Sequence, residues 1–161
     1  MNRLMSMKKV FAFCIPLLLF CQFAEGQKIL PYISPGYGFS WDFSGHFISS
    51  PKLSIGILPE GGIYYNITIG ASFSSNEKNY PNVYCEAQCG RVLDQSVYGG
   101  GIGLTIPAGD NESRVSLRVS GCTGFLIFLN ATVLFSDTIQ TEFGGQAVLP
   151  IPLAKFTSSD D

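Results

Sequence analysis

The stretch GIYYNITIGASF, residues 62–73, alternates between apolar and polar side chains without interruption. Ile63 and Ile67 are among the residues of one face, and Asn66 and Thr68 are among those of the other. A period of two places successive side chains on opposite faces of an extended chain, so this stretch predicts a β-strand with one apolar and one polar face. The apolar face must be covered either by a protein core or by lipid.

The same alternation recurs along the chain. It is found in eight segments, at residues 29–40, 46–58, 63–74, 80–91, 96–107, 113–121, 125–136 and 139–149. Short turn-forming sequences such as PEGG, LDQ and GCTG separate them, as in consecutive antiparallel hairpins. Because such a meander can close on itself, the sequence predicts an all-β fold, an eight-stranded antiparallel up-and-down β-barrel over residues 27–152. A polar tail is predicted over residues 153–161.

The N-terminal sequence MNRLMSMKKVFAFCIPLLLFCQFAEGQ has the organisation of an export signal. Basic residues including Arg3 precede an apolar run, and Ala24 and Gly26 supply the small residues that signal peptidase requires. The sequence therefore predicts a cleaved signal peptide over residues 1–26. The alternative, an N-terminal membrane anchor, is disfavoured because the apolar run is shorter than the roughly 20 residues of a spanning helix.

The polar faces of the predicted strands carry mainly Gly, Ser, Thr, Asn and Gln. The water-facing side of a soluble sheet usually carries many Lys and Glu side chains, yet charged residues make up only 14% of this chain. Small polar groups suit a narrow packed interior, where charges must be paired because an isolated buried charge is very costly. We therefore predict a lumen salt-bridge cluster of Lys52, Glu86, Arg114, Arg118 and Glu142. A less favoured alternative has Arg114 and Arg118 bind an anionic ligand.

Aromatic residues lie near the predicted strand ends, where membrane barrels carry interfacial girdles. Trp41, Phe43, Phe73, Tyr80 and Phe135 flank alternate turns, and Tyr64, Tyr65 and Phe125 lie near the other turns. If the first strand starts on the periplasmic side, the longer turns near residues 41–45, 75–79 and 108–112 lie outside the cell. This asymmetry is expected of an outer-membrane barrel.

With its export signal and eight alternating segments, the chain resembles the small eight-stranded bacterial outer-membrane β-barrels, the OmpA and OmpX size class. The resemblance covers residues 28–152. It implies a cell-envelope protein with transmembrane β-strands that contacts membrane lipid and is inserted by the outer-membrane assembly machinery. The last strand of such barrels usually ends in an aromatic residue. In this sequence, Pro150 and Pro152 stand where the last strand should finish. Either the strand stops by Leu149, or the chain is not a closed transmembrane barrel.

An eight-stranded barrel has an interior just wide enough to be filled by side chains. We therefore predict a structural or surface-interaction role, not that of an open porin or an enzyme. The alternative is a soluble β-barrel or sandwich, periplasmic or secreted, in which the faces invert and the apolar face forms a core that binds an apolar ligand. A third, more distant alternative is an enzyme that modifies lipid A.

Three cysteines remain after removal of the signal peptide, namely Cys85, Cys89 and Cys122. Cys85 and Cys89 are about 13 Å apart along one strand, beyond the roughly 7 Å limit of a disulfide. A disulfide is possible only between Cys122 and either Cys85 or Cys89. The favoured interpretation is that the cysteines are small apolar residues on a buried or lipid-facing surface.

Candidate chemistry is sparse elsewhere in the sequence. Asp42, Ser44 and the single histidine, His46, share one face, but such neighbours on an extended strand are about 6.6 Å apart, too far for catalytic hydrogen bonds. One histidine and three cysteines make a poor zinc site, and a net charge of −2 gives no field for nucleic acid. The glycines of residues 99–103 mark close backbone approach or a bend. We expect no catalytic residues, cofactor or metal.

Overall fold

The computed structural model describes residues 29–75, 81–93, 96–108, 115–124, 127–137 and 139–153. The predicted signal peptide lies outside these ranges, as do residues 154–161 of the predicted tail. The strands are β1 (Ile29–Asp42), β2 (Phe47–Pro59), β3 (Ile63–Ser74), β4 (Asn82–Leu93), β5 (Ser96–Pro107), β6 (Ser116–Gly124), β7 (Ile127–Phe135), β8 (Ile139–Val148) and β9 (Ile151–Pro152). No helix in this part of the chain is long and apolar enough to span a membrane.

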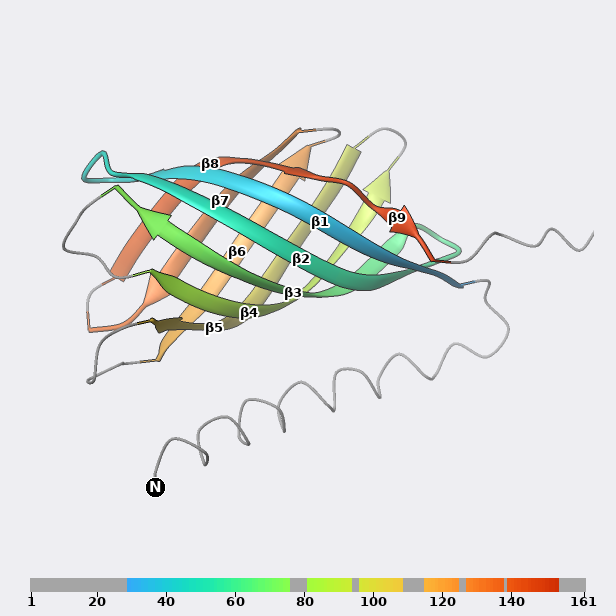
Figure 1. The fold of residues 1–161 in the computed structure, drawn as a ribbon. Coiled ribbons are helices and arrows are strands. Elements are labelled where there is room, and N and C mark those ends of the chain that lie inside the picture. Colours follow the sequence, from blue (N-terminus) through green and yellow to red (C-terminus); the bar gives the residue numbers. More distant parts are fainter. Residues whose placement is uncertain are drawn as a thin grey trace, which may run out of the picture.

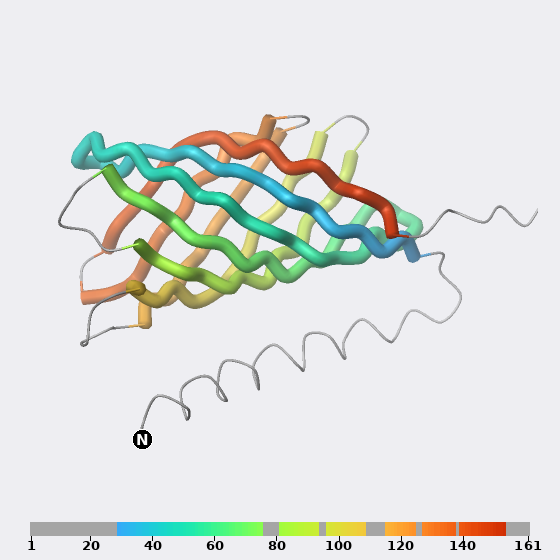
Figure 2. The backbone as a smooth tube through the Cα atoms, in the orientation of Figure 1, coloured from blue at the N-terminus to red at the C-terminus, as the bar shows by residue number. Residues whose placement is uncertain are grey.

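Each strand from β1 to β8 pairs antiparallel with the next, and β8 pairs with β1 (Figure 1). The chain is therefore the closed eight-stranded meander that the sequence predicted, and Figure 2 shows its backbone in the same view. The expected turn GCTG belongs instead to β6, where Gly121 pairs with Gly100 and Ala131. Alternation continues through these small residues, which is why the strand does not end there.

The stagger of the barrel is measured by following cross-strand partners once around it. From Tyr32 on β1 the path returns to β1 at Asp42, which is 10 residues further along that strand. It runs through Gly56, Asn66, Gln88, Gly101, Ser120, Thr132 and Glu142. For eight strands spaced by about 4.8 Å, with about 3.3 Å per residue, this stagger tilts the strands by about 40°.

The two rims of the barrel differ. The terminal rim holds Ile29 and Pro152, at the right of Figure 1, and its connections are residues 60–62, 94–95 and 125–126. The other connections are residues 43–46, 75–81, 108–115 and 136–138, at the loop rim, and the first three of them are longer than any at the terminal rim. This is the asymmetry that the turn lengths in the sequence predicted.

The barrel closes despite the prolines that follow its last long strand. The chain leaves β8, passes Leu149 and Pro150, and resumes as β9 in the same register against β1. The backbone N–H of Leu149 donates to the carbonyl oxygen of Pro35 over 3.0 Å, and that of Leu153 donates to Pro31 over 2.9 Å. The long strand β8 thus stops before Leu149, the first of the two alternatives, and the barrel is nevertheless closed.

The position of these prolines explains why the last strand tolerates them. Backbone groups of alternate residues point to opposite sides of a strand, and Leu149 and Leu153 point toward β1. Pro150 and Pro152 therefore direct their nitrogen atoms away from β1, to a side where β9 has no partner among the described strands. A proline there removes a donor only from an unpaired edge, and it hinders addition of a foreign strand.

Restoring those two donors is expected to promote self-association. In the double variant Pro150→Val and Pro152→Val, the open edge gains two N–H groups, each worth about 1 kcal/mol when paired. Chemical cross-linking of the protein in detergent should then give dimers that the parent protein does not form. A variant that remains monomeric at every concentration would show that the prolines do not protect this edge.

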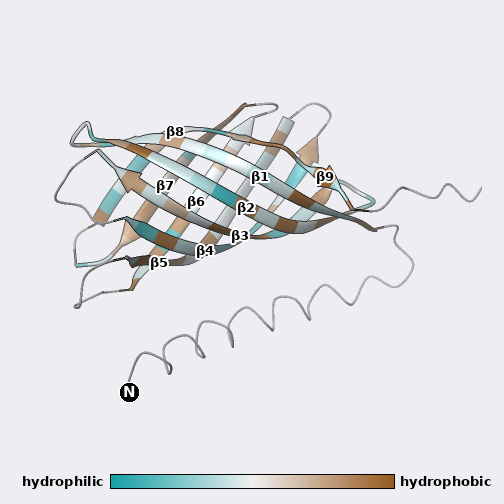
Figure 3. Ribbon diagram, viewed as in Figure 1, coloured by the Kyte–Doolittle hydropathy of each residue, from teal (hydrophilic) through white to brown (hydrophobic). Residues whose placement is uncertain are grey.

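Hydrophobic and hydrophilic residues are interspersed along the strands (Figure 3), and the distribution of their side chains between the interior and the surface is inverted relative to a soluble protein. Among the described residues, eleven buried side chains are polar or charged and five are apolar, whereas 28 large hydrophobic side chains are exposed. The five are Ile48, Tyr64, Tyr84, Phe128 and Leu134. The alternative of a soluble barrel with an apolar core is therefore wrong, because the apolar face of every long strand points outward.

Candidate functional site

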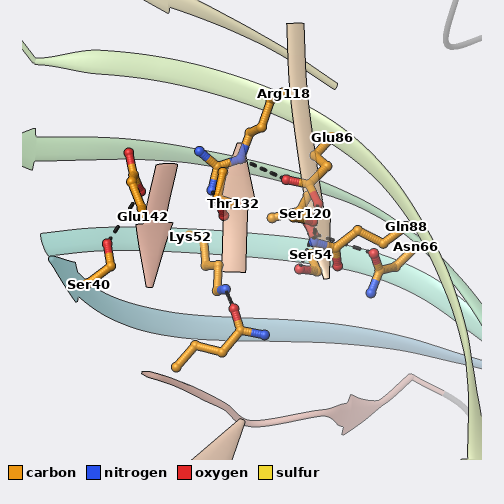
Figure 4. Close-up of polar contacts among 12 residues, drawn as sticks. Ser40, Lys52, Ser54, Asn66, Glu86, Gln88, Arg118, Ser120, Thr132 and Glu142 are labelled. Atoms are coloured by element: carbon orange, nitrogen blue, oxygen red, sulfur yellow. Dashed lines mark hydrogen bonds and ion pairs between the residues drawn. The ribbon is translucent and has the colours of Figure 1, made fainter. Parts of the chain in front are cut away.

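The centre of the lumen holds a buried ion pair between Glu86 on β4 and Arg118 on β6 (Figure 4). Arg118 Nε donates to Glu86 Oε2 over 2.9 Å, and the two residues are only 6% and 1% exposed. Arg118 Nη2 also donates to Thr132 Oγ1 over 3.3 Å, and the guanidinium lies 4.2 Å from the centre of the Tyr84 ring. The cation is therefore held by a carboxylate, a hydroxyl and an aromatic face.

The second carboxylate oxygen of Glu86 is also satisfied. Glu86 Oε1 accepts hydrogen bonds from Gln88 Nε2, over 2.8 Å, and from Ser120 Oγ. A buried ion pair is tolerated only when its remaining lone pairs and protons find partners, and here both oxygens have them. A Cβ on Gly101 would collide with this carboxylate, and a Cβ on Gly103 would collide with the backbone of Cys85 and Glu86. The glycine run therefore provides close backbone approach, one of the two roles that its sequence predicted.

Neutral hydrogen bonds extend this network toward the terminal rim. Ser54 Oγ and Thr68 Oγ1 are 2.7 Å apart, and Thr68 Oγ1 donates to Gln88 Oε1 over 3.3 Å. Asn66 Nδ2 donates to the Tyr32 hydroxyl over 3.2 Å. The chain of contacts links β1, β2, β3 and β4 through the interior, so it ties together strands that are not all neighbours.

The other members of the predicted cluster occupy different places. Lys52 Nζ donates to Gln146 Oε1, and Glu142 Oε2 accepts from Ser40 Oγ over 3.3 Å. Both residues therefore lie in the lumen, but neither forms an ion pair with another described residue. Arg114 lies outside the described residues. The structure thus joins Glu86 to Arg118 and keeps Lys52 and Glu142 as separate charges, each bonded to a neutral partner.

Two buried tyrosines were not part of the predicted cluster. Tyr64, which the sequence placed near an aromatic girdle, instead points into the lumen, where its hydroxyl is 3.8 Å from Cys122 Sγ. Tyr84 is also buried and lies over Gly70. The alternation along the strand already indicated that Tyr64 points inward, because its neighbour Tyr65 points outward. The position of Tyr64 near a strand end predicted its direction less well.

These side chains leave little free space in the lumen. The cavity beside the ion pair has a volume of about 20 Å³ and is lined by residues that include Lys52, Glu86, Arg118, Asn130 and Gln146. Such a volume holds about one water molecule. The buried Oδ1 of Asn130 has no partner in the structure, so an ordered water there would satisfy it.

The three cysteines do not meet. Cys122 borders the lumen cavity, whereas Cys85 and Cys89 occupy outward positions on β4, and all three are thiols in the structure. The barrel wall separates Cys122 from the other two. The structure therefore contains no disulfide between Cys122 and either Cys85 or Cys89, the pairing that the sequence left possible.

The predicted interface aromatics that the structure describes are exposed on the outer surface. They are Trp41, Phe43, Tyr65, Phe73 and Phe135; Tyr80 and Phe125 lie outside the described residues. Trp41 makes edge-on ring contacts with Phe39 and Phe47, at centroid distances of 6.2 and 5.5 Å. Phe43 contacts Phe143 at 5.5 Å. Aromatic side chains thus gather on β8, β1 and β2 near the loop rim.

The hairpin between β1 and β2 brings together a histidine and an aspartate. His46 Nδ1 is 2.9 Å from Asp42 Oδ2, and the backbone N–H of His46 donates to Asp42 Oδ1 over 2.8 Å. The sequence argument assumed an extended strand and so missed this contact, which a turn ending at Gly45 creates. No hydrogen bond joins Ser44 to His46 in this part of the chain. Among the described residues, no group of three or more His, Cys, Asp and Glu side chains could hold a metal ion.

The closed eight-stranded meander with a polar interior and an apolar exterior is the fold of the small outer-membrane β-barrels, as the sequence resemblance implied. No protein-family model matches the sequence, and a comparison with curated proteins gives no match. Among solved structures, the chain is similar to the Yersinia pestis outer membrane protein Ail in a phospholipid bilayer nanodisc. That similarity has a TM-score of 0.42 at 11% identity and covers 73% of this chain and 99% of that chain.

Proposed function

We propose that this protein is a small barrel of the bacterial outer membrane, with a packed polar lumen and a structural or surface-interaction role. The inverted distribution of side chains carries this proposal. Soluble monomers rarely expose contiguous apolar patches larger than a few hundred Å². In a bilayer the same surface is favourable, and a closed barrel leaves few backbone groups unpaired.

The dimensions of the barrel support the same proposal. The shortest of the eight barrel strands, β6 and β7, have nine residues. At a tilt of about 40° and about 3.3 Å per residue, nine residues rise by about 23 Å, close to the roughly 25 Å apolar band of outer-membrane barrels. We place the terminal rim in the periplasm and the loop rim outside the cell, because short periplasmic turns and longer external loops are the rule in this class.

Passage of solutes is not part of the proposed role. The Glu86–Arg118 pair and the tyrosines fill the lumen, and the adjacent cavity holds about one water molecule. Catalysis is not proposed either, because the Asp42–His46 pair has no hydrogen bond to a nucleophile among the described residues. The proposed role therefore depends on the outer surface and the rims, not on the interior.

Two measurements test this proposal. The protein, expressed with its N-terminal segment, should be recovered in the outer-membrane fraction and migrate differently on a gel with and without boiling. In planar bilayers the purified protein should give no discrete conductance steps. Recovery as a soluble periplasmic or secreted monomer would refute the membrane location, and stable conductance steps would refute the closed lumen.

A further inference from the structure

The outer face of the barrel contains one row of polar side chains. Arg91 on β4 is the direct cross-strand partner of Tyr98 on β5, and Tyr98 is the direct partner of Thr123 on β6. All three side chains are exposed. Directly opposed residues have Cβ atoms about 5 Å apart, so a guanidinium and two hydroxyl groups lie side by side on three adjacent strands.

Arg91 is exceptional among the charged residues of the described strands. The other five, Asp42, Lys52, Glu86, Arg118 and Glu142, occupy inward positions on their strands. Arg91 alone points outward, and neither ion pair of the described residues, Asp42–His46 or Glu86–Arg118, involves it. No described carboxylate on the outer face of the strands can therefore neutralise this cation.

The row lies close to the terminal rim. Arg91 is two residues from the end of β4, Tyr98 is two residues from the start of β5, and Thr123 is one residue from the end of β6. Tyr65, which is also exposed, is diagonal to Arg91 because its direct partner on β4 is Cys89. This level corresponds to the boundary between acyl chains and headgroups, where arginine and tyrosine side chains are tolerated on the lipid face.

We propose that Arg91, Tyr98 and Thr123 form a binding site for the phosphate group of an anionic phospholipid, one whose phosphate charge is not neutralised by a cationic headgroup, in the leaflet at the terminal rim. A phosphate diester accepts hydrogen bonds and carries a negative charge, and this row offers two hydroxyl donors beside a positively charged guanidinium. The planar guanidinium can bind two phosphate oxygens at once. The exposed side chain of Ile102, four residues beyond Tyr98 toward the middle of β5, provides apolar surface for the acyl chains.

The site deepens the proposed function and rests on it, because the row meets a headgroup only if the barrel is inserted. Phospholipid is chosen over lipopolysaccharide because the terminal rim is placed in the periplasmic leaflet. Both carry phosphate, so a test must present them separately. Ser49 and Thr141 occupy outward positions without a cation beside them, which makes them suitable for comparison.

The experiment uses the full chain in nanodiscs of phosphatidylcholine with about a fifth phosphatidylglycerol, and identifies the lipids retained by native mass spectrometry after gentle detergent transfer. The parent protein should retain phosphatidylglycerol in preference to phosphatidylcholine. Arg91→Gln should reduce that retention by about tenfold, the loss expected for one charge-assisted contact. Arg91→Lys keeps the positive charge but not the planar guanidinium, and it should retain an intermediate amount of phosphatidylglycerol. Thr141→Val should retain as much phosphatidylglycerol as the parent protein.

Insertion is measured on the same samples by heat-modifiable migration. A protein that never inserts would overturn both the membrane location and this site. Inserted protein with equal phosphatidylglycerol retention in the parent and in Arg91→Gln would overturn the site alone. Displacement of phosphatidylglycerol by lipopolysaccharide in nanodiscs containing both, lost in Arg91→Gln, would also overturn it, because the phosphate would then come from the other leaflet.

Discussion

Replacement of Glu86 with alanine is expected to lower the free energy of unfolding by about 3–5 kcal/mol, the range for breaking a buried ion pair by removing one partner. The variant leaves the Arg118 guanidinium inside the lumen without its carboxylate, and it also removes the acceptor of Gln88 and Ser120. Unfolding by urea in lipid vesicles measures the change. The single tryptophan, Trp41, lies on the outer face and reports loss of the folded state.

Two controls separate the ion pair from other effects of the substitution. Glu60→Ala removes an exposed glutamate from the β2–β3 turn, and it should change the unfolding free energy by no more than about 0.5 kcal/mol. Adding Arg118→Met to Glu86→Ala removes the unpaired charge, so the double variant should recover a large part of the loss. A loss below about 1 kcal/mol in Glu86→Ala would mean that water reaches the pair, contrary to a packed lumen.

The periodicity of the sequence was sufficient to predict the strands because each strand has one face toward the polar lumen and the other toward the exterior of the barrel. Residues 63–74 and 96–107 were predicted with the bounds that β3 and β5 have in the structure. The shift of β6 to Ser116–Gly124 arose because glycine, cysteine and threonine at residues 121–124 suit both a turn and a strand. Local composition could not decide between them, whereas pairing of Gly121 with its neighbours does.

The partners inside the lumen could not be predicted from the sequence in the same way. Parity shows which side chains point inward, but the stagger between strands decides which of them meet. Glu86 and Arg118 are 32 residues apart in the chain, and they meet across β5 because Gly101 and Gly103 leave space between them. Lys52 has the same parity on β2, yet its height in the barrel brings it to Gln146 instead. The register between the strands, not the type of residue, therefore determines which inward side chains contact one another.

Substitution of Ile69 by arginine is expected to distinguish a lipid-facing exterior from a water-facing one. Ile69 lies near the middle of β3, points outward and is 58% exposed. At the midplane of a bilayer an arginine on the lipid face costs about 2–4 kcal/mol. On a surface in contact with water the same change is usually within about 0.5 kcal/mol of neutral. Urea unfolding of the protein inserted in vesicles gives the difference directly.

The matched control is Ile139→Arg, at the first residue of β8 on the loop rim. Ile139 is 69% exposed, slightly more than Ile69, so exposure alone predicts that the two variants behave alike. A bilayer predicts instead that the cost falls to about 0–1 kcal/mol near its interface, where the side chain reaches the headgroups. A large loss in Ile69→Arg with a small one in Ile139→Arg would therefore identify depth as the controlling variable. Equal and small effects would mean that water contacts the whole apolar face, and the membrane location would have to be abandoned.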